Sequence, residues 1–252
     1  MRRILVIVPI PLDKDDIARR QSQLAELEVG PDVSFEFRSV KVGPGYFDSY
    51  HDSLLAEVAV TEAGMRAEIE GYDGVCVDTM SDSGVSVLRS ILNIPVVGPG
   101  RVSFLTALML GRRFSVLTLW GAWESGYRVT LRELGLEDRC VSIRWPEGVE
   151  PDLRTLLEGK AETVLPKLVK AGEECIRDGA DVICLGSTSM HEAHAYLAGH
   201  LPVPVLNPGP LSYKLIESLL SLGLRQSRAA YSEPRGPRRE LFEAMITAAA
   251  KI

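Results

Sequence analysis

The 252-residue sequence lacks several features that would assign it to a class at once. Its four cysteines form no Cys-x-x-Cys pair, which argues against a disulfide framework and favours a reducing compartment. Its longest apolar run, Ile4 to Leu12, is broken by two prolines and is too short to span a bilayer. Basic residues (28) do not outnumber acidic ones (34), so general nucleic-acid binding is not expected. No phosphate-binding glycine motif occurs, so we expect no nucleotide cofactor. These absences favour a cytoplasmic protein with no membrane or nucleic-acid partner.

Strand-length apolar runs alternate with stretches of helical period, which is the pattern of an α/β fold. The runs are almost continuously hydrophobic, which is typical of parallel strands covered by helices on both faces. The expected strands are Ile4–Val8, Val33–Val40, Gly74–Val77, Phe114–Leu119, Val141–Arg144 and Val182–Leu185. The expected helices are Asp15–Glu26, Leu54–Glu70, Ser83–Leu92, Val102–Leu110, Glu124–Leu134, Glu162–Arg177, Met190–Ala198 and Leu211–Leu222, with one more amphipathic helix after Pro237.

Three segments of the first part of the chain recur in the same order 108 to 110 residues later. The matched pairs are Arg2–Val6 with Arg112–Val116, Gly71–Ser81 with Gly179–Ser189, and Ile94–Gly100 with Val203–Gly209. One such match is easily a coincidence, but three at one spacing predict two similar α/β halves. Since a helix follows each Pro-Val strand, we expect residues 1–98 plus 208–252 to form the first half and residues 99–207 the second.

Two hydroxyl-rich turns follow matching strands of the repeat. Asp78-Thr79-Met80-Ser81 follows one strand, and Gly186-Ser187-Thr188-Ser189 follows its counterpart. Ligands of open α/β sheets bind beyond the carboxyl ends of the strands, and each turn leads into a helix whose first N–H groups favour an anion. The alternative is that these hydroxyls only cap the helices. The matched pair predicts a binding site formed by both turns.

Four stretches of the sequence resemble one enzyme family: GYDGVCVDTMSDSG, GRRFSVLTL, VICLGSTSM and LGLRQSRAAYSEP. Their order and spacing resemble the aspartate/glutamate racemase superfamily, nearest its hydantoin racemase branch. The resemblance covers most of the chain. It implies two pseudo-symmetric, parallel-sheet (flavodoxin-like) halves with an active-site cleft between them. It also implies a homo-oligomer, a dimer or higher, and an enzyme without cofactor or metal that acts on a small molecule.

In that family two cysteines act as acid and base on a carbon beside a carboxylate or carbonyl. Carried over by position, the first falls on Thr79 and the second on Ser187, so both thiols are replaced by hydroxyls. An alcohol is far harder to ionise near neutrality than a thiol. Cys76 and Cys184 lie three residues earlier in apolar strands, and we expect them to be small core residues.

Another acid or base must therefore assist, and the nearby candidates are Asp78, Asp82, His191 and Glu192. We expect Thr79, Ser187 and His191 to be the catalytic residues. His191 and His194 share a helix face, but their spacing alone is a weak metal motif, and no metal is expected. The expected substrate-binding residues are Met80, Ser81, Thr118, Trp120, Thr188 and Ser189.

The function expected from the resemblance is a racemase or isomerase reaction on a small substrate that carries a carboxylate, amide or imide. Three alternatives stay open because the thiols are absent. They are a lyase or decarboxylase, a hydrolase with Ser187 as nucleophile, and an inactive relative that only binds a small ligand.

Overall fold

The computed structural model describes residues 1–149 and 160–251, which fold as two compact units. The first unit contains the chain up to Gly98 and from Ser212 onward, and the second contains Pro99–Leu211. No helix in the described residues is long and apolar enough to cross a membrane.

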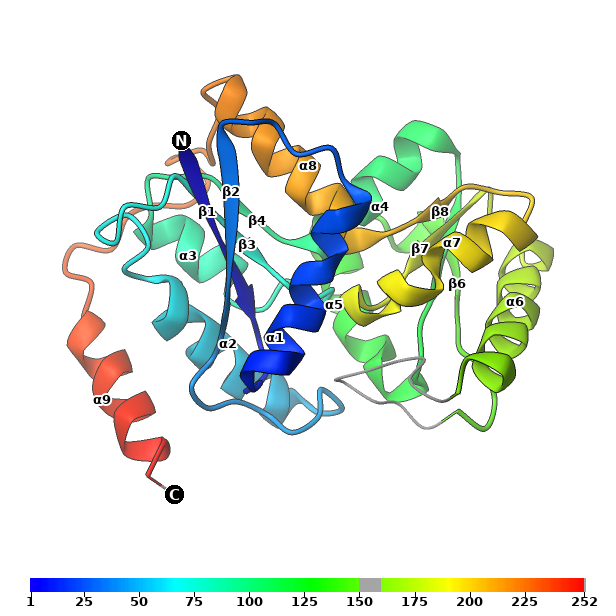
Figure 1. The fold of residues 1–252 in the computed structure, drawn as a ribbon, viewed down its shortest axis with the longest axis horizontal. Coiled ribbons are helices and arrows are strands. Elements are labelled where there is room, and N and C mark those ends of the chain that lie inside the picture. Colours follow the sequence, from blue (N-terminus) through cyan, green and yellow to red (C-terminus); the bar gives the residue numbers. More distant parts are fainter. Residues whose placement is uncertain (150–159, 252) are drawn as a thin grey trace. The chain divides into compact units, whose positions relative to one another are not determined.

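The first unit is built on a four-stranded parallel sheet of order β2-β1-β3-β4. Figure 1 shows its strands and the helices around them. In chain order its elements are β1 (Arg2–Val8), α1 (Lys14–Gln21), η1 (Ser22–Glu26), β2 (Val33–Ser39), α2 (Tyr50–Gly64), β3 (Gly74–Val77), α3 (Val85–Ile91), β4 (Val96–Val97), most of α8 (Pro208–Ser221), and α9 (Arg239–Ala249).

The second unit repeats this arrangement with a parallel sheet of order β6-β5-β7-β8. Its elements are α4 (Pro99–Leu110), β5 (Phe114–Leu117), η2 (Gly121–Trp123), α5 (Glu124–Leu134), η3 (Glu137–Arg139), β6 (Cys140–Arg144), α6 (Ala161–Arg177), β7 (Val182–Leu185), η4 (Thr188–Met190), α7 (His191–His200) and β8 (Val205–Leu206). The expected α/β class and the pair of similar parallel sheets are confirmed.

Equivalent residues of the repeat make equivalent contacts inside each unit. In the first unit, the backbone N–H of Arg3 donates to the carboxylate of Asp73 at 2.7 Å. In the second, the N–H of Arg113 donates to the carboxylate of Asp181 at 3.1 Å. Each aspartate directly precedes the third strand of its unit and accepts a hydrogen bond from the start of the first strand. Residues matched by the repeat therefore have the same structural role in both units.

The first sheet is buried on both faces by helices. Leu5, Ile7, Val75 and Val77 on one face pack in a core cluster with residues of α2 and α3. On the other face, Tyr213 of α8 makes edge and tilted ring contacts with Phe35 and Phe37 of β2. Such two-sided burial explains why β3 and the part of β1 after Arg3 carry no polar residue, whereas the edge strand β2 is mostly only partly buried and alternates with polar residues.

The second sheet follows the same plan. Phe104 of α4 stacks on Phe114 of β5 with ring centroids 5.3 Å apart. Cys184 of β7 donates through its Sγ to the carbonyl of Ser103 in α4 (3.7 Å). The repeat-related contact in the first unit joins Cys76 Sγ to the Ser212 carbonyl (4.0 Å). Both cysteines thus face covering helices.

One helix differs clearly from its expected bounds. The expected helix Leu54–Glu70 is wrong at both ends, because α2 spans Tyr50–Gly64. It starts earlier because the Ser49 side chain accepts a hydrogen bond from the Asp52 N–H (3.2 Å), which caps the first turn. After Gly64 the chain continues in tight turns up to Gly71, which has a φ of 80°. Positive φ suits glycine, and Gly71 is the last residue of these turns before β3.

Candidate functional site

The turn after β3 carries a chain of hydrogen-bonded hydroxyls. The Thr79 and Ser81 hydroxyl oxygens lie 3.0 Å apart, and the Ser81 and Ser83 hydroxyl oxygens lie 2.8 Å apart. The Thr79 hydroxyl also accepts a long hydrogen bond from the Ser81 backbone N–H (3.5 Å). Asp82 in the same turn adopts a φ of 53°, which bends the backbone sharply before α3. This geometry fixes the direction of the hydroxyls.

The turn after β7 has the same local structure. The Ser187 and Ser189 hydroxyl oxygens lie 2.8 Å apart, and the Ser187 hydroxyl accepts from the Ser189 backbone N–H (3.3 Å). Ser187 therefore caps η4, as the helix-cap interpretation expects. Capping uses only part of its bonding capacity, since a hydroxyl has one proton and two lone pairs.

Exposure separates the hydroxyls of the two turns. Thr79, Ser81 and Ser187 are partly exposed. The side chains of the other expected turn residues, Met80, Thr188 and Ser189, are buried. Thr79 and Ser187, the two turn residues expected from the sequence to be catalytic, are therefore accessible.

A buried ion pair lies next to Thr79. Asp78 is buried, and its carboxylate lies 3.6 Å from the Arg20 guanidinium of α1. The Tyr213 hydroxyl donates to the same carboxylate (3.4 Å). Burial raises the pKa of Tyr213 well above its usual value, and the negative charge of Asp78 adds to this. Asp78 is thus held among structural partners at the base of the turn.

In the second unit the residue before Ser187 is Gly186, so no charged side chain corresponds to Asp78. The Tyr127 hydroxyl donates to the Gly186 carbonyl at 2.6 Å and lies 2.6 Å from the Thr118 hydroxyl. Because the phenol has one proton, Thr118 must donate to it. A Cβ on residue 186 would lie only 2.8 Å from the Tyr127 oxygen, so glycine permits this approach. Thr118, expected to bind substrate, is fully buried in this network.

The expected acid and base candidates differ in placement. Asp82 is buried like Asp78. Glu192 is exposed, and His191 is half-buried at the first position of α7, four residues after Ser187. His194 is directed elsewhere, since its Nε2 donates to the Val205 carbonyl of β8 (3.1 Å). Among the described residues, no three His, Cys, Asp or Glu side chains are grouped as a metal site would require.

None of the four thiols is placed to ionise readily. Burial raises the pKa of Cys76 and of Cys184 well above the usual value. Burial also raises the pKa of Cys140 to about 11 and that of Cys175 to about 12. Cys76 and Cys184 are completely buried, in agreement with the core role expected from the sequence.

The sequence analysis missed two side chains that hold the turns. Arg20 lies in a polar helix with nothing local to mark its pairing with Asp78, 58 positions away. Tyr127 lies in α5 at an apolar helical position, which disguises its hydroxyl contact with Gly186. The one signal in the sequence for the Tyr127 contact was Gly186, the residue before Ser187, because a glycine at a strand end allows another group to approach closely.

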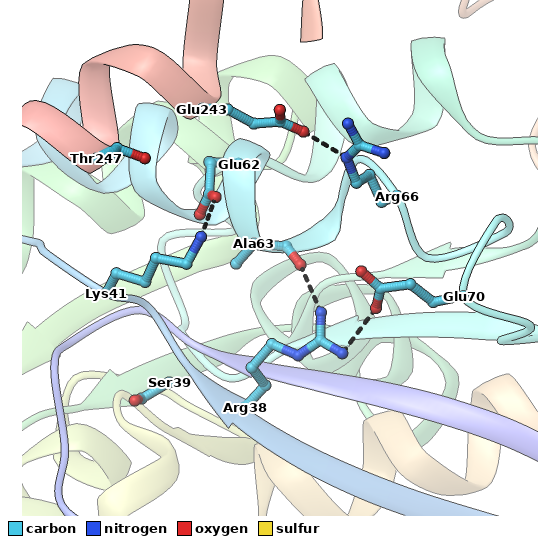
Figure 2. Close-up of a pocket in the computed structure, with 9 residues that line it drawn as sticks. All are labelled: Arg38, Ser39, Lys41, Glu62, Ala63, Arg66, Glu70, Glu243 and Thr247. Atoms are coloured by element: carbon cyan, nitrogen blue, oxygen red, sulfur yellow. Dashed lines mark hydrogen bonds and ion pairs between the residues drawn. The ribbon is translucent and has the colours of Figure 1, made fainter. Parts of the chain in front are cut away.

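A polar cavity of about 290 Å³ lies elsewhere in the first unit, among β2, α2 and α9 (Figure 2). Three cations line it, and each pairs with a carboxylate: Lys41 with Glu62 (2.6 Å), Arg38 with Glu70 (2.7 Å), and Arg66 with Glu243. The charges are balanced within the wall, so the cavity has no excess charge to attract an ionic ligand. We interpret it as part of the interface at which α9 packs against α2.

Known proteins share this fold and resemble this sequence. A family model described as Asp/Glu/Hydantoin racemase matches residues 16–215. A hydantoin racemase of Pseudomonas sp. (strain NS671) is 30% identical over 192 residues, which are 75% of each chain. Among solved structures, allantoin racemase from Pseudomonas fluorescens is 27% identical with a TM-score of 0.81, covering 94% of this chain and 98% of that one. Allantoin racemase from Klebsiella pneumoniae, at 24% identity, has the same fold with a TM-score of 0.82, covering 94% of this chain and 95% of that one. With its fold, its sequence segments and the extent of the family match in agreement, the chain belongs to the Asp/Glu/hydantoin racemase family and is an enzyme of the racemase type.

Proposed function

We propose that this enzyme, without a cofactor, inverts a carbon beside a carbonyl in a small cyclic amide or imide of the hydantoin or allantoin type. The observation that carries the proposal is the pair of matching turns, in which Thr79 and Ser187 present accessible hydroxyls after β3 and β7. The relatives named hydantoin racemase and allantoin racemase support the choice of substrate class.

The chemistry requires a proton to leave the carbon while negative charge develops on the neighbouring carbonyl oxygen. Preorganised hydrogen-bond donors stabilise such an oxyanion in the transition state. The role we assign to Thr79 and Ser187 is this donation, because alcohols do not ionise readily near neutrality. That both turns contact one substrate molecule stays a prediction of the sequence repeat.

His191 is our candidate for the proton transfer. Of the four acid and base candidates, Asp78 and Asp82 are buried, and Asp78 is paired with Arg20. His191 is half-buried and begins α7 close to Ser187 in the chain. An imidazole is the side chain whose unperturbed pKa suits proton exchange near neutrality.

Proton NMR in D₂O tests the proposal with a panel of single-enantiomer hydantoins, allantoin and acidic amino acids. The expected result is loss of the signal of the proton beside the carbonyl at a rate above that of buffer alone, and chiral chromatography of the product should detect both enantiomers. His191→Gln should slow this exchange by about 10²-fold or more, and His200→Gln, on the same helix, is the control.

The same spectra separate the competing functions. Opening of the ring would identify a hydrolase, and loss of a carboxyl group from an added malonate would identify a decarboxylase. Binding without any exchange would identify an inactive relative. Any of these results, without exchange above the buffer rate, overturns the racemase proposal.

A further inference from the structure

All three tryptophans of the chain lie at the carboxyl-end edge of the second sheet. Trp120 and Trp123 belong to the loop and short helix after β5, and Trp145 directly follows β6. The turn that carries Ser187 follows β7, which is the other neighbour of β5. Two of the tryptophans are therefore on the loop beside the candidate catalytic turn, and the third is on the next loop along the sheet.

The indoles are held together by specific contacts. The Trp120 and Trp123 rings meet edge to face, with centroids 6.2 Å apart and planes inclined at 77°. The Trp145 ring lies against the backbone of Gly121, where an added Cβ would come within 2.6 Å of the ring. Only glycine allows the ring to lie so close. The loops after β5 and β6 are thus joined through indole packing.

The same loop is tied to the Ser187 turn. Thr118, at the start of the loop, is hydrogen-bonded to Tyr127, which holds the Gly186 carbonyl. The β5 and β7 ends are also joined directly, because the Gly186 N–H donates to the Leu117 carbonyl (2.7 Å). A substrate whose reacting carbon is at Ser187 therefore has the tryptophan loop as an immediate neighbour.

The exposure of the indoles indicates what they bind. Trp145 is 40% exposed and Trp120 is partly exposed, so aromatic surface is available to a ligand. Trp123 is only 8% exposed, and its indole N–H has no hydrogen-bond partner among the described residues. The accessible aromatic surface is therefore that of Trp120 and Trp145, and the buried Trp123 packs against Trp120.

We infer that Trp120, Trp123 and Trp145 form a subsite for a flat, apolar substituent on the substrate ring. This inference rests on the proposed function, because it takes the Ser187 turn as the place of reaction, and it specifies the substrate class. Substrates with an aromatic substituent stack on the indoles, whereas those with no substituent, or with a carboxylate, gain nothing from them.

Intrinsic fluorescence tests this inference directly, because every tryptophan of the chain belongs to the subsite. The probes are 5-benzylhydantoin, unsubstituted hydantoin and 5-carboxymethylhydantoin, titrated with excitation selective for tryptophan. We expect 5-benzylhydantoin to bind at least about tenfold more tightly than the other two and to change the emission. Equal affinities for the three probes, or titration with no change in emission, would overturn the subsite.

Two variants make the test specific. Gly121→Ala displaces the Trp145 ring and should reduce the preference for 5-benzylhydantoin about fivefold or more, whereas Gly199→Ala, where a Cβ meets nothing within 4 Å, should retain it. Trp145→Leu replaces Gly121→Ala if that variant does not fold, with the same expected loss. An undiminished preference in both variants contradicts the inference.

The binding experiment tests the subsite, and the exchange experiment tests the proposed function, so each proposal can be rejected without the other. Exchange of hydantoin protons without any preference for the benzyl group would leave the proposed function standing and remove the subsite. Tight, selective binding of 5-benzylhydantoin without exchange would support the subsite and remove the racemase reaction.

Discussion

The Tyr127 hydroxyl donates a 2.6 Å hydrogen bond to the carbonyl oxygen of Gly186, the residue before Ser187. Tyr127 is fully enclosed, and burial raises the pKa of its phenol, so the proton that makes this bond stays in place. The contact fixes the backbone from which the Ser187 side chain projects.

Tyr127→Phe removes this bond and leaves both the Gly186 carbonyl and the Thr118 hydroxyl without their partner. We expect the second unit to lose about 1–3 kcal/mol of unfolding free energy, the cost of unsatisfied buried polar groups. Urea unfolding followed by tryptophan fluorescence measures this unit, because all three tryptophans lie in it. Tyr196→Phe, on the exposed side of α7, serves as the control. An unchanged midpoint for Tyr127→Phe would contradict the proposed network.

The buried ion pair of Arg20 and Asp78 predicts that substitutions of these two residues have strongly non-additive effects on the stability of the first unit. Both side chains are buried, so Arg20→Met alone leaves an uncompensated buried carboxylate and should destabilise the unit by about 3–5 kcal/mol. Asp78→Asn alone should destabilise it similarly. The double variant should recover part of the loss, since neither charge then remains. Hydrogen exchange of β1 and β3 amides reports the effect, with Arg2→Met at the exposed strand end as the control. Strictly additive losses would show that the two groups are not coupled.

The buried thiols predict slow alkylation at neutral pH. Because burial raises the pKa of Cys140 to about 11 and that of Cys175 to about 12, and raises those of Cys76 and Cys184 as well, little thiolate forms at pH 8. Iodoacetamide labelling followed by mass spectrometry should be slow in the folded protein and fast in urea. Rapid labelling of Cys76 or Cys184 in the folded state would reopen these residues as catalytic groups.

The same shifts predict a loss of stability at alkaline pH. An unfolded chain releases thiol protons near pH 8.5, whereas the folded chain retains them. The stabilising contribution is therefore complete below about pH 8.5 and is lost as the pH rises through the folded values of about 11 and about 12. Thermal unfolding midpoints measured from pH 7 to pH 11 should fall with pH, and less steeply in Cys140→Ala. An equal fall in that variant would assign the effect to other groups.

Thiols placed in the two turns give the complementary prediction. Positions 79 and 187 are partly exposed, so Thr79→Cys combined with Ser187→Cys should supply groups that ionise more readily than the native thiols. If proton transfer limits the reaction, deuterium exchange should rise by about 10²-fold or more. A matched variant with cysteine at the accessible position 81 should not show this increase. Decreased exchange in the double variant would contradict this prediction and would show that hydrogen-bond donation by the hydroxyls, which thiols provide only weakly, limits the reaction.

The fold was largely predictable because its signals are local. The buried strands Gly74–Val77 and Val182–Leu185 are continuous apolar runs and were found with their observed bounds. The repeat predicted two similar sheets, and both sheets have the same strand order. The end of α2 was missed because helical periodicity continues beyond Gly64, while the chain itself turns.

The candidate site was less predictable because its supports are distant in sequence. Thr118 was expected to reach the substrate, but a tyrosine nine residues later encloses its hydroxyl. The contact of Trp145 with Gly121 joins loops from two strands, and no local pattern marks it. Sequence order identified which turns carry hydroxyls, whereas packing determines which of those hydroxyls are accessible.

The central claim, that the hydroxyls of Thr79 and Ser187 serve a racemase reaction, is tested most directly by one comparison. Deuterium incorporation beside the carbonyl of one hydantoin enantiomer should be measured for the unaltered enzyme, Thr79→Val, Ser187→Ala and the control Ser90→Ala. We predict incorporation above the buffer rate for the unaltered enzyme and the control, and a loss of about 10²-fold or more in each of the other variants. Full incorporation in Thr79→Val and Ser187→Ala, or none in the unaltered enzyme, would contradict the account.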